Sequence, residues 1–400
     1  MSMNVYRYGK NLRCGYTTGA CAAAAAKAAA ALLLTGTAPD TVELVLAGEP
    51  AVFPVERREL TGSGEGQAAR CAVRKDAGDD PDVTHGLLVE ASVRRGDGPG
   101  AEIRIRGGEG VGIVTKPGLD QPPGEAAINT GPRNMIREAV RSICRETGFS
   151  GALEVTISVP GGAEAAARTF NPDLGIEGGI SILGSTGIVE PMSEPALIQS
   201  IQTEMRVRWL DLCAGTKPGE APPPLVLVPG NYGMTFAKKN LGAASEQIIK
   251  CSNLIGEALD SACELAVPRI ILAGNLGKLV KLAGGIFNTH SRHADCRMDI
   301  LMRCTVEAAA QAAEVQLSPE ELQGLLQELD RCVTTDAAAA VLARGGCLES
   351  VMQIVMKKAA RHVSRRVQGA AEPPEVELFM IANDMKILGN IRVIPGEESR

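Results

Sequence analysis

Aromatic residues are scarce in this chain of 400 residues, at 3% of the total with a single tryptophan. Surfaces that stack nucleic-acid bases need aromatic faces, so a base-stacking platform is not expected. The formal net charge of −6 also argues against nucleic acid or an anionic membrane as the main partner. No strongly apolar run reaches the roughly 18 residues that cross a bilayer. The first residues, MSMNVYRYGKN, lack the apolar core of a secretory signal.

Cysteine pairs in a CxxC arrangement are also missing, although the chain has eleven cysteines. An odd number of cysteines, scattered over apolar and helical patterns, does not indicate a disulfide framework and is typical of a reducing compartment. We therefore expect a cytoplasmic protein. The phosphate-loop pattern GxxxxGK[ST] is absent too, which argues against hydrolysis of nucleoside triphosphates.

The length predicts two domains, because a single core rarely extends over 400 residues. Residues 1–147 are expected to form an α+β domain with a mainly antiparallel sheet. Period-two alternation predicts its strands, and residues 131–147 predict a helix that closes the domain. The strand candidates are residues 40–48, 68–76, 87–95 and 101–115.

Residues 148–400 show a different pattern, in which a short apolar run ends in a glycine turn four times. The runs lie in LEVTISVPGG, GGISILGSTGIVEP, APPPLVLVPGNYG and PRIILAGNLGK, with helical segments between most of them. This pattern is typical of a parallel sheet covered by helices on both faces. Ligands bind such sheets at the carboxyl ends of the strands, where the glycine turns lie. Residues 305–368 predict helices, and residues 373–384 predict a final strand.

A threonine–glycine loop stands directly before an alanine-rich helix in RCGYTTGACAAAAAKAAAALL. Thr17 or Thr18 is expected to cap this helix, and Gly36 is expected to end it. The loop offers N–H and O–H donors at the positive end of the helix, which favours an anion such as a carboxylate or phosphate. Thr17, Thr18 and Gly19 are therefore candidate ligand contacts. The alternative is a capped and tightly packed helix that does no chemistry.

An acidic run, RKDAGDDPDVTHG, begins at Arg74. Its aspartates Asp76, Asp79 and Asp82 are close together beside Lys75, and Gly78 and Pro81 indicate a shaped turn, which makes the run a candidate functional loop. The run lacks the ligand ladder of a calcium loop. A solvated acidic loop is the alternative interpretation.

Basic residues follow several of the glycine turns. In GGEGVGIVTKPGL, Lys116 comes after a glycine pattern similar to a nucleotide fingerprint, but a strand continues where that fingerprint needs a helix. Lys278 and Lys281 lie three residues apart on one helical face and could hold acidic substrate groups. His290 and His293 are also three residues apart, but a metal site usually needs a third converging ligand, so no metal is expected.

The motifs quoted above, together with PGEAAINTGPRNMI, NPDLGIEGGISILGSTGIVEPMS and GKLVKLAGGIFNTHS, resemble the cobalt-precorrin-5B C1-methyltransferases of anaerobic cobalamin (vitamin B12) biosynthesis. The likeness covers most of residues 10–300. It rests on several separate motifs in one order, which is more specific than any single glycine loop. The resemblance implies an N-terminal α+β domain and, over residues 148–400, a Rossmann-like α/β domain with a helical C-terminal part.

The resemblance also implies a reaction. Members of the family use S-adenosyl-L-methionine as methyl donor and methylate C1 of cobalt-precorrin-5B to give cobalt-precorrin-6A. The expected partner is this cobalt-containing tetrapyrrole, with a homo-oligomer as a further expectation. Two alternatives remain open: a non-enzymatic tetrapyrrole-binding carrier protein, and an acyl- or phosphoryl-transfer enzyme that uses GNLGK as an anion loop.

The substrate's many carboxylates need donors, while the glycine loops at strand ends suit the donor nucleoside. The expected substrate contacts are Thr17, Thr18, Gly19, Lys116, Lys278 and Lys281. The expected cofactor contacts are Gly184, Thr186, Gly187, Gly230, Asn231 and Gly233. A base that removes a ring proton is expected among the catalytic candidates Asp76, Asp79, Asp82 and His290.

Overall fold

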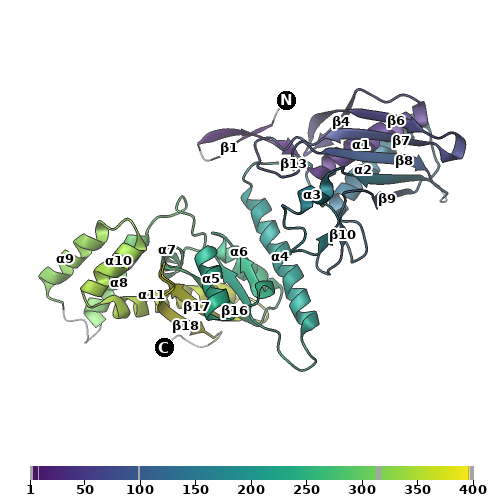
Figure 1. Cartoon of the computed structure of the whole chain (residues 1–400). Helices are drawn as coiled ribbons and strands as arrows, with labels where there is room; N and C mark the ends of the chain where they lie inside the picture. Colours follow the sequence, from purple (N-terminus) through teal and green to yellow (C-terminus); the bar gives the residue numbers. More distant parts are fainter. Residues whose placement is uncertain (1–2, 8, 98–99, 312–316, 395, 397–400) are drawn as a thin grey trace. The chain divides into compact units, whose positions relative to one another are not determined.

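The computed structural model describes residues 3–7, 9–97, 100–311, 317–394 and 396, and the chain divides into two compact units. Unit 1 is Met1–Glu194 and unit 2 is Pro195–Arg400 (Figure 1). The domain boundary expected after residue 147 therefore differs from the one observed. The reason is the strand Leu153–Ser158, which is hydrogen-bonded into the middle of the unit 1 sheet.

Unit 1 is built on a five-stranded sheet. All neighbouring strands are antiparallel except the last two, which are parallel. The mainly antiparallel sheet predicted by the alternation of these residues is thus confirmed. In spatial order the strands are β6 (Arg57–Thr61), β7 (Ala68–Arg74), β8 (Leu88–Arg95), β11 (Leu153–Ser158) and β9 (Ile103–Gly107).

Within the described residues, unit 1 also contains four two-stranded pairs. The segment GGISILGSTGIVEP, expected as a strand of the second domain, lies in unit 1, where it contributes β13 antiparallel to β3. The pairs are β1 (Asn4–Arg7) with β2 (Lys10–Arg13), β3 (Gly15–Tyr16) with β13 (Ile188–Val189), β4 (Thr41–Leu46) with β5 (Glu49–Pro54), and β10 (Ile113–Val114) with β12 (Ile176–Glu177). A 3-10 turn, η1 (Gly64–Gly66), and a short helix, α3 (Gly162–Ala166), complete the unit.

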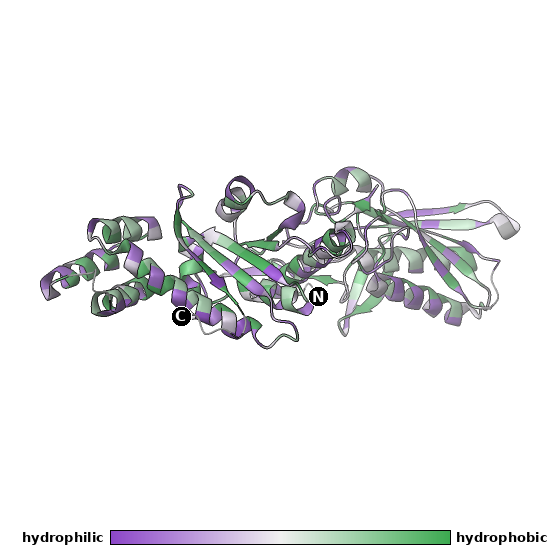
Figure 2. Cartoon of the chain, turned by 90° about the horizontal axis from the view of Figure 1, so that it is seen from below, coloured by the Kyte–Doolittle hydropathy of each residue, from purple (hydrophilic) through white to green (hydrophobic). Residues whose placement is uncertain are grey.

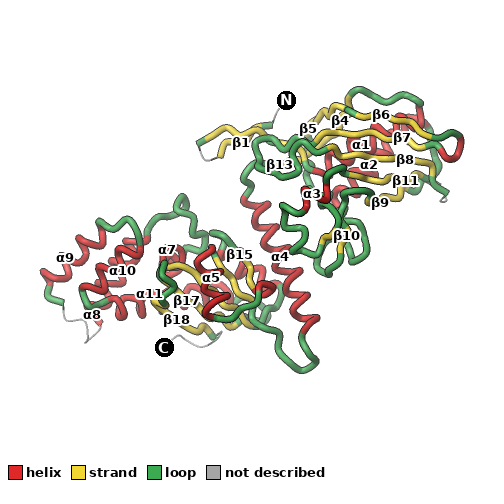
Figure 3. The backbone as a smooth tube through the Cα atoms, in the orientation of Figure 1, coloured by secondary structure: helices red, strands yellow, loops and turns green. Residues whose placement is uncertain are grey.

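The alanine-rich helix α1 (Thr18–Thr35) begins and ends as the sequence predicts. The hydroxyl of Thr17 accepts a hydrogen bond from the N–H of Ala20 at 3.1 Å, and Gly36 ends the helix with a φ of 77°. A second helix, α2 (Thr130–Thr147), lies beside it against the sheet (Figure 3). Alanines are buried around the whole circumference of α1, because the small side chains let both the sheet and α2 approach closely.

Helix α1 is also the one described helix that is long and apolar enough to cross a membrane by length and composition. In the structure, 83% of that window is buried inside the protein, as in the core helix of a soluble domain. All eleven cysteines are free thiols in the structure.

Unit 2 is built on a second five-stranded sheet, in which the first four strands are parallel and the last is antiparallel. Two of the four predicted strand–glycine runs and the predicted final strand belong to it. In spatial order the strands are β15 (Ile248–Lys250), β14 (Leu225–Val228), β16 (Arg269–Asn275), β17 (Glu375–Ile381) and β18 (Ile387–Val393).

Helices cover both faces of this sheet, as the short apolar strands predict. Leu225 and Leu227 pack into the larger core with most of the helices, whereas Val226 and Val228 pack with Ala237 on the opposite face. Figure 2 shows hydrophobic residues along the strands and more hydrophilic residues on the outer helices. The helices are α4 (Glu194–Gly215), α5 (Asn231–Asn240), α6 (Ile255–Glu264), α7 (Leu276–Leu279), α8 (Arg297–Gln311), α9 (Pro319–Asp330), α10 (Thr335–Arg344) and α11 (Leu348–Val367), with 3-10 turns η2 (Ser245–Gln247) and η3 (Val280–Gly284).

The helical region predicted over residues 305–368 corresponds to the end of α8 and to α9, α10 and α11. Residues 312–316 of that prediction lie outside the described residues.

Candidate functional site

A pocket of about 500 Å³ opens at the carboxyl ends of β14 and β16 in unit 2. This volume lies within the about 300–1,000 Å³ that is typical of small-molecule sites. The lining comes from the segments that follow β14, β15 and β16 and from the loop before α8. The lining residues are Pro229, Gly230, Tyr232, Gly233, Asn253, Asn275, Gly277, Lys278, Lys281, Thr289, His290, Ser291 and Arg297.

The pocket lies where the strand order of the sheet reverses. From β14 the chain crosses to β15 on one side, and it then returns past β14 to β16 on the other side. The segments that leave β14 and β16 therefore diverge and leave a crevice between them. In open parallel sheets, this crevice is the usual place for a ligand.

The two expected glycines after β14 have different surroundings. Gly230 has an extended backbone with a φ of 178°, and a Cβ added there would lie 3.8 Å from Lys278 Nζ. A Cβ on Gly233 would lie 2.2 Å from the carbonyl oxygen of Ala273. Gly230 therefore borders open space in the pocket, whereas Gly233 allows α5 to lie against β16. The third expected residue, Asn231, accepts a hydrogen bond from Lys250 Nζ at 2.9 Å.

Lys278 is the half-buried cation of the pocket. Its ammonium donates to the carbonyl oxygen of Pro229 at 2.5 Å and lies 3.5 Å from that of Ser252. Burial lowers the pKa of Lys278, and the charges of Lys250 and Lys281 act in the same direction. Among the described residues, no aspartate or glutamate lines the pocket. The charge of Lys278 therefore suits an anionic group of a ligand.

Lys281 has internal partners. It is 2% exposed, and its ammonium donates to the carbonyl oxygens of Thr289 at 3.0 Å and Ala294 at 2.7 Å. These bonds hold the loop that carries His290. Nδ1 of His290 accepts from the N–H of Arg292 at 3.1 Å, so the proton of the neutral ring resides on Nε2. His290 thus presents a donor to its surroundings, with its basic lone pair already engaged.

The acidic loop lies in unit 1, close to Arg13. The guanidinium donates to both carboxylate oxygens of Asp76, at 2.5 and 2.8 Å, and the backbone N–H of Arg13 donates to Asp79 at 2.7 Å. The hydrogen bond from Arg13 is the main cause that lowers the pKa of Asp76 to about 2. A carboxylate with so low a pKa is a weak base at neutral pH, so the geometry of Asp76 suits loop shaping better than proton removal.

Asp82 forms a second ion pair in the same loop. It accepts from Lys75 Nζ at 2.6 Å, and its other oxygen accepts from the N–H and hydroxyl of Thr84 at 2.7 and 2.6 Å. Burial raises the pKa of Asp82, but the charge of Lys75 and these hydrogen bonds outweigh burial and bring the pKa below its usual value. Lys75 is 2% exposed, so this pair fixes the loop from the inside.

The first turn of α1 is bonded to the segment 181–187. The hydroxyl of Thr18 accepts from the N–H of Leu183 at 3.0 Å and lies 3.2 Å from the carbonyl oxygen of Ser181. The N–H of Gly19 donates to the carbonyl oxygen of Leu183 at 3.1 Å. Thr17 and Thr18 are both buried. Several donors expected to meet a ligand therefore hold a neighbouring loop in the structure.

That neighbouring loop carries three of the expected cofactor residues. The N–H of Thr17 donates to the carbonyl oxygen of Gly187 at 2.9 Å, and a Cβ on Gly184 would lie 2.3 Å from Thr17 Cγ2. Thr186 is exposed and accepts from the N–H of Ile188 at 3.3 Å. The loop and the threonines are thus one assembly within unit 1.

Lys116 belongs to another part of unit 1. It follows β10 and is half-buried. Its side chain passes Gly175, where a Cβ would lie 2.4 Å from Lys116 Cγ.

The expected site residues therefore fall into two groups. Residues 184–187 lie in unit 1 and residues 230–233 lie in unit 2, and both stretches stay predicted cofactor contacts. The pairing of β13 with β3 fixes residues 184–187 beside α1. Unit 1 contains Thr17, Thr18, Gly19, Asp76, Asp79, Asp82, Lys116, Gly184, Thr186 and Gly187, whereas unit 2 contains Gly230, Asn231, Gly233, Lys278, Lys281 and His290.

Sequence reasoning missed several polar residues of the pocket, among them Asn253, Asn275, Thr289 and Arg297. Asn275 ends β16, and Asn253 comes three residues after β15. The sequence feature that could have identified them is an asparagine at or just after the carboxyl end of an apolar strand. Strand β15 has only three residues, which made it hard to recognise.

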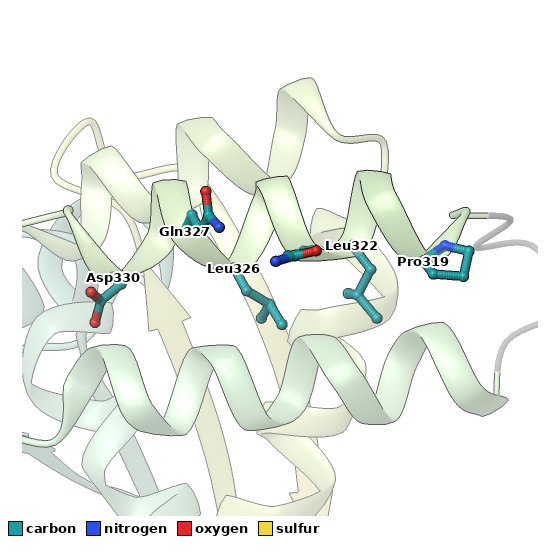
Figure 4. Close-up of a pocket in the computed structure, with 6 residues that line it drawn as sticks. Pro319, Leu322, Leu326, Gln327 and Asp330 are labelled. Carbon is teal, nitrogen blue, oxygen red and sulfur yellow. The ribbon is translucent and has the colours of Figure 1, made fainter.

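A second depression runs along α9 and is lined by Pro319, Leu322, Gln323, Leu326, Gln327 and Asp330 (Figure 4). All of these residues come from one helix, and Leu322 and Leu326 are half-buried. No set of polar groups from different elements converges there among the lining residues. The pocket at β14 and β16 is therefore the better candidate.

Metal ligands are not gathered in the described ranges, where no group of three or more His, Cys, Asp or Glu side chains is placed to hold an ion. The rings of His290 and His293 lie 6.5 Å apart between centroids.

Two family models match the chain. The model described as CbiD matches residues 5–191, and the model described as the C-terminal domain of CbiD matches residues 288–392. The first match ends close to the boundary of unit 1.

Curated relatives bear one name. A cobalt-precorrin-5B C(1)-methyltransferase of Ruminiclostridium cellulolyticum is 41% identical over 379 residues, which cover 95% of this chain and 92% of the relative. One from Thermoanaerobacter sp. is 48% identical over 302 residues, covering 75% of this chain and 77% of the relative. A crystal structure of the cobalamin biosynthesis protein CbiD from Archaeoglobus fulgidus is 30% identical, covers 73% of this chain and 86% of its own, and aligns with a TM-score of 0.38.

Proposed function

The chain belongs to the CbiD family, and on this basis we propose that it is the cobalt-precorrin-5B C1-methyltransferase of cobalamin biosynthesis, with the methyl donor bound in the pocket at β14 and β16. The 41% identity over nearly the whole chain carries the activity. A non-enzymatic tetrapyrrole carrier is not favoured, because relatives of which the matches cover 92% and 95% are named as methyltransferases.

We propose S-adenosyl-L-methionine as the donor, and the residues of the pocket fit it. The donor supplies a methyl carbon that its sulfonium makes electrophilic. Gly230 leaves open space beside Lys278, whose ammonium has no acidic partner among the pocket-lining residues and suits the carboxylate of the donor. The amides of Asn253 and Asn275 lie at strand ends, where they suit hydroxyl groups.

In unit 1, Lys116 is proposed to contact a carboxylate of the tetrapyrrole, because an ammonium donates charge-assisted hydrogen bonds to carboxylates. Thr17 and Thr18 act as positioning residues, because their own polar atoms already hold the loop 181–187. Asp76, Asp79 and Asp82 likewise shape their loop through bonds to Arg13, Lys75 and Thr84.

The protein's main contribution to the reaction is then the placement of two reactants, since methyl transfer needs an in-line approach of the acceptor carbon. Among the four candidates for proton removal, both carboxylate oxygens of Asp76 and Asp82 and Nδ1 of His290 accept hydrogen bonds, and Asp79 accepts through one oxygen. His290 is placed to donate a hydrogen bond from Nε2 to a ligand group.

Two measurements on the full chain test this proposal. Transfer of a labelled methyl group from S-adenosylmethionine to cobalt-precorrin-5B tests the activity. Calorimetric binding of S-adenosylhomocysteine to wild type and Lys278→Met tests the donor site. We expect at least about tenfold weaker binding by Lys278→Met, the loss typical of a charge-assisted hydrogen bond. Equal binding by the two proteins would place the donor elsewhere, and binding of tetrapyrrole without methyl transfer would support the carrier.

A further inference from the structure

A chain of hydrogen bonds connects α10 to the edge of the pocket. Asp336, in the first turn of α10, accepts from the backbone N–H of Asn383 at 3.1 Å and from its side-chain amide at 2.7 Å. The amide oxygen of Asn383 accepts from the side-chain amide of Asn275 at 2.7 Å. The amide oxygen of Asn275 accepts from the backbone N–H of Gly277 at 2.7 Å. Asn275 and Gly277 line the pocket, whereas Asp336 and Asn383 do not.

The carboxylate of Asp336 fixes which group donates and which group accepts in each of these hydrogen bonds. An ionised aspartate only accepts hydrogen bonds, so the side chain of Asn383 must turn its NH₂ group toward Asp336 and its oxygen toward Asn275. Asn275 must in turn direct its own NH₂ group toward Asn383, which leaves its oxygen for Gly277. Rotation of a side-chain amide by half a turn exchanges its oxygen with its NH₂ group, and the carboxylate favours one of the two orientations in both amides.

The last bond of the chain shapes the pocket. By accepting from Gly277, Asn275 caps the turn that leads directly into Lys278. Lys278 donates across the crevice to the carbonyl oxygen of Pro229. The orientation of Asn275 therefore controls both an amide in the lining and the start of the segment that places the pocket cation.

We propose that Asp336 and Asn383 are positioning residues of the pocket, which fix the orientation of Asn275 and through it the turn Asn275–Lys278. As a statement about ligand binding, this inference rests on the proposed function, in which the pocket holds the methyl donor. Neither residue touches the ligand. They affect the affinity for the ligand by fixing which way the side-chain amide of Asn275 is turned.

Asp336 has a second role that a test must separate. As an acidic residue in the first turn of α10, it also stabilises that helix. Loss of its charge would therefore weaken the fold locally even if the hydrogen-bond chain from Asp336 through Asn383 and Asn275 to Gly277, called the relay below, had no effect on the pocket. A reciprocal exchange distinguishes the two roles, because it restores the polarity of the relay while it leaves the first turn of α10 without its carboxylate.

The experiment compares Asp336→Asn, Asn383→Asp and the double variant with wild type. In Asp336→Asn, one of the two oxygens that accept from Asn383 is replaced by an NH₂ group, so position 336 no longer requires one orientation of Asn383, and Asn383 and then Asn275 are free to turn over. In Asn383→Asp, two carboxylates face each other, and their repulsion displaces the side chain at position 383 from Asp336 and from Asn275. In the double variant, the carboxylate at position 383 accepts from the new amide and from Asn275, so the orientation of Asn275 is restored.

Two readouts follow the relay. Binding of S-adenosylhomocysteine, measured by calorimetry, should weaken about fivefold in each single variant, as for a lost helix cap. It should return to within about twofold of wild type in the double variant. The hydrogen-exchange rate of the Gly277 amide should be higher than in wild type in the single variants. In the double variant, it should return to the wild-type rate. Asp384→Asn is the matched control, because Asp384 lies in the same turn and accepts from the N–H of Lys386. It should leave both readouts unchanged.

The two proposals fail in different ways. If wild type does not bind S-adenosylhomocysteine, the donor site is overturned, and Gly277 exchange still decides on the relay. If wild type binds and the double variant is as weak as the single variants, Asp336 acts only through α10, and the relay is overturned. Unchanged binding and exchange in both single variants would overturn it as well.

Discussion

Gly184 approaches Thr17 so closely that a Cβ on the glycine would lie 2.3 Å from Thr17 Cγ2, and the backbone of Gly184 has a φ of 111°. The start of α1 and the loop 181–187 are therefore fitted to each other through a position where only glycine is tolerated. Thr17 has two tasks here: its hydroxyl caps α1, and its N–H donates to Gly187.

Gly184→Ala is expected to destabilise unit 1 strongly. A left-handed backbone costs a non-glycine residue roughly 1 kcal/mol or more, and the clash with Thr17 adds to this cost. Gly178→Ala is the matched control, since Gly178 also has a positive φ, of 78°, but a Cβ there would meet no atom within 4 Å. Thermal melting should show a clearly larger drop for Gly184→Ala. Equal drops would mean that the contact with Thr17 has no energetic weight.

Gly230→Ala is expected to fold normally and to bind S-adenosylhomocysteine more weakly. Its extended φ suits any residue, and the added methyl group would project toward Lys278 Nζ, into the proposed donor site. Gly233→Ala should instead lose stability, because its Cβ would lie 2.2 Å from a backbone oxygen of β16. Calorimetry and melting of both variants separate ligand contact from packing. Wild-type affinity of a folded Gly230→Ala protein would argue against this placement of the donor.

The ion pair of Asp76 with Arg13 predicts acid sensitivity. Because the pKa of Asp76 is lowered from 3.8 to about 2, its charge stabilises the folded state above about pH 4, and this contribution is lost as the pH falls through about 2. With the side chain of Asp76 42% exposed, solvent screening limits the effect to the order of 1 kcal/mol.

Urea unfolding at several pH values tests that contribution. Asp76→Asn should be less stable than wild type at pH 7, and the two proteins should converge near pH 2. The same substitution at the exposed Asp173 should show no such convergence, because it changes little at any pH. A constant difference between wild type and Asp76→Asn down to pH 2 would contradict the assignment.

Lys278 predicts how ligand binding depends on alkaline pH. Because burial lowers its pKa, its charge is lost at a lower pH than for an exposed lysine. An anionic ligand group binds the charged form, so the affinity for S-adenosylhomocysteine should fall as the pH rises through that lowered pKa. Lys278→Arg keeps its charge and should show a flatter profile between about pH 7 and pH 10. The difference between the two profiles cancels titration of the ligand itself, and parallel profiles would remove Lys278 from the site.

Features that depend on neighbouring residues were predictable from the sequence. The caps of α1 at Thr17 and Gly36 are examples, since a cap is decided within one helical turn. The parallel strands β14 and β16 were predictable too, because burial on both faces produces a continuous apolar run.

Pairing between distant strands was not predictable in the same way. Strand β11 and the segment before β13 show the same apolar run and glycine turn as β14, yet they belong to unit 1. The pattern indicates a buried strand and a turn, but it does not say which sheet receives the strand. For the same reason the expected boundary at residue 147 was too early.

The candidate site was predictable to a similar extent. Gly230 and Lys278 follow strands of the parallel sheet, where the general rule for such sheets predicts ligand contacts, and both line the pocket. Asn383 is 108 residues away from Asn275 in the chain, and its role emerges only when β16 and β17 are paired. The pairing of β13 with β3 likewise decides that residues 184–187 belong to unit 1.

The buried alanines of α1 limit how this protein can drift during evolution. Ala22, Ala24 and Ala26 are completely buried between a sheet and a second helix. A larger side chain at these positions would force the layers apart, and glycine would loosen the helix by roughly 1 kcal/mol. Alanine is therefore the residue whose side-chain volume suits each of these positions, because a larger side chain does not fit and glycine weakens the helix. The run of alanines thus reflects how closely the sheet and α2 approach α1. The substitutions tolerated along α1 would show how much side-chain volume that approach allows.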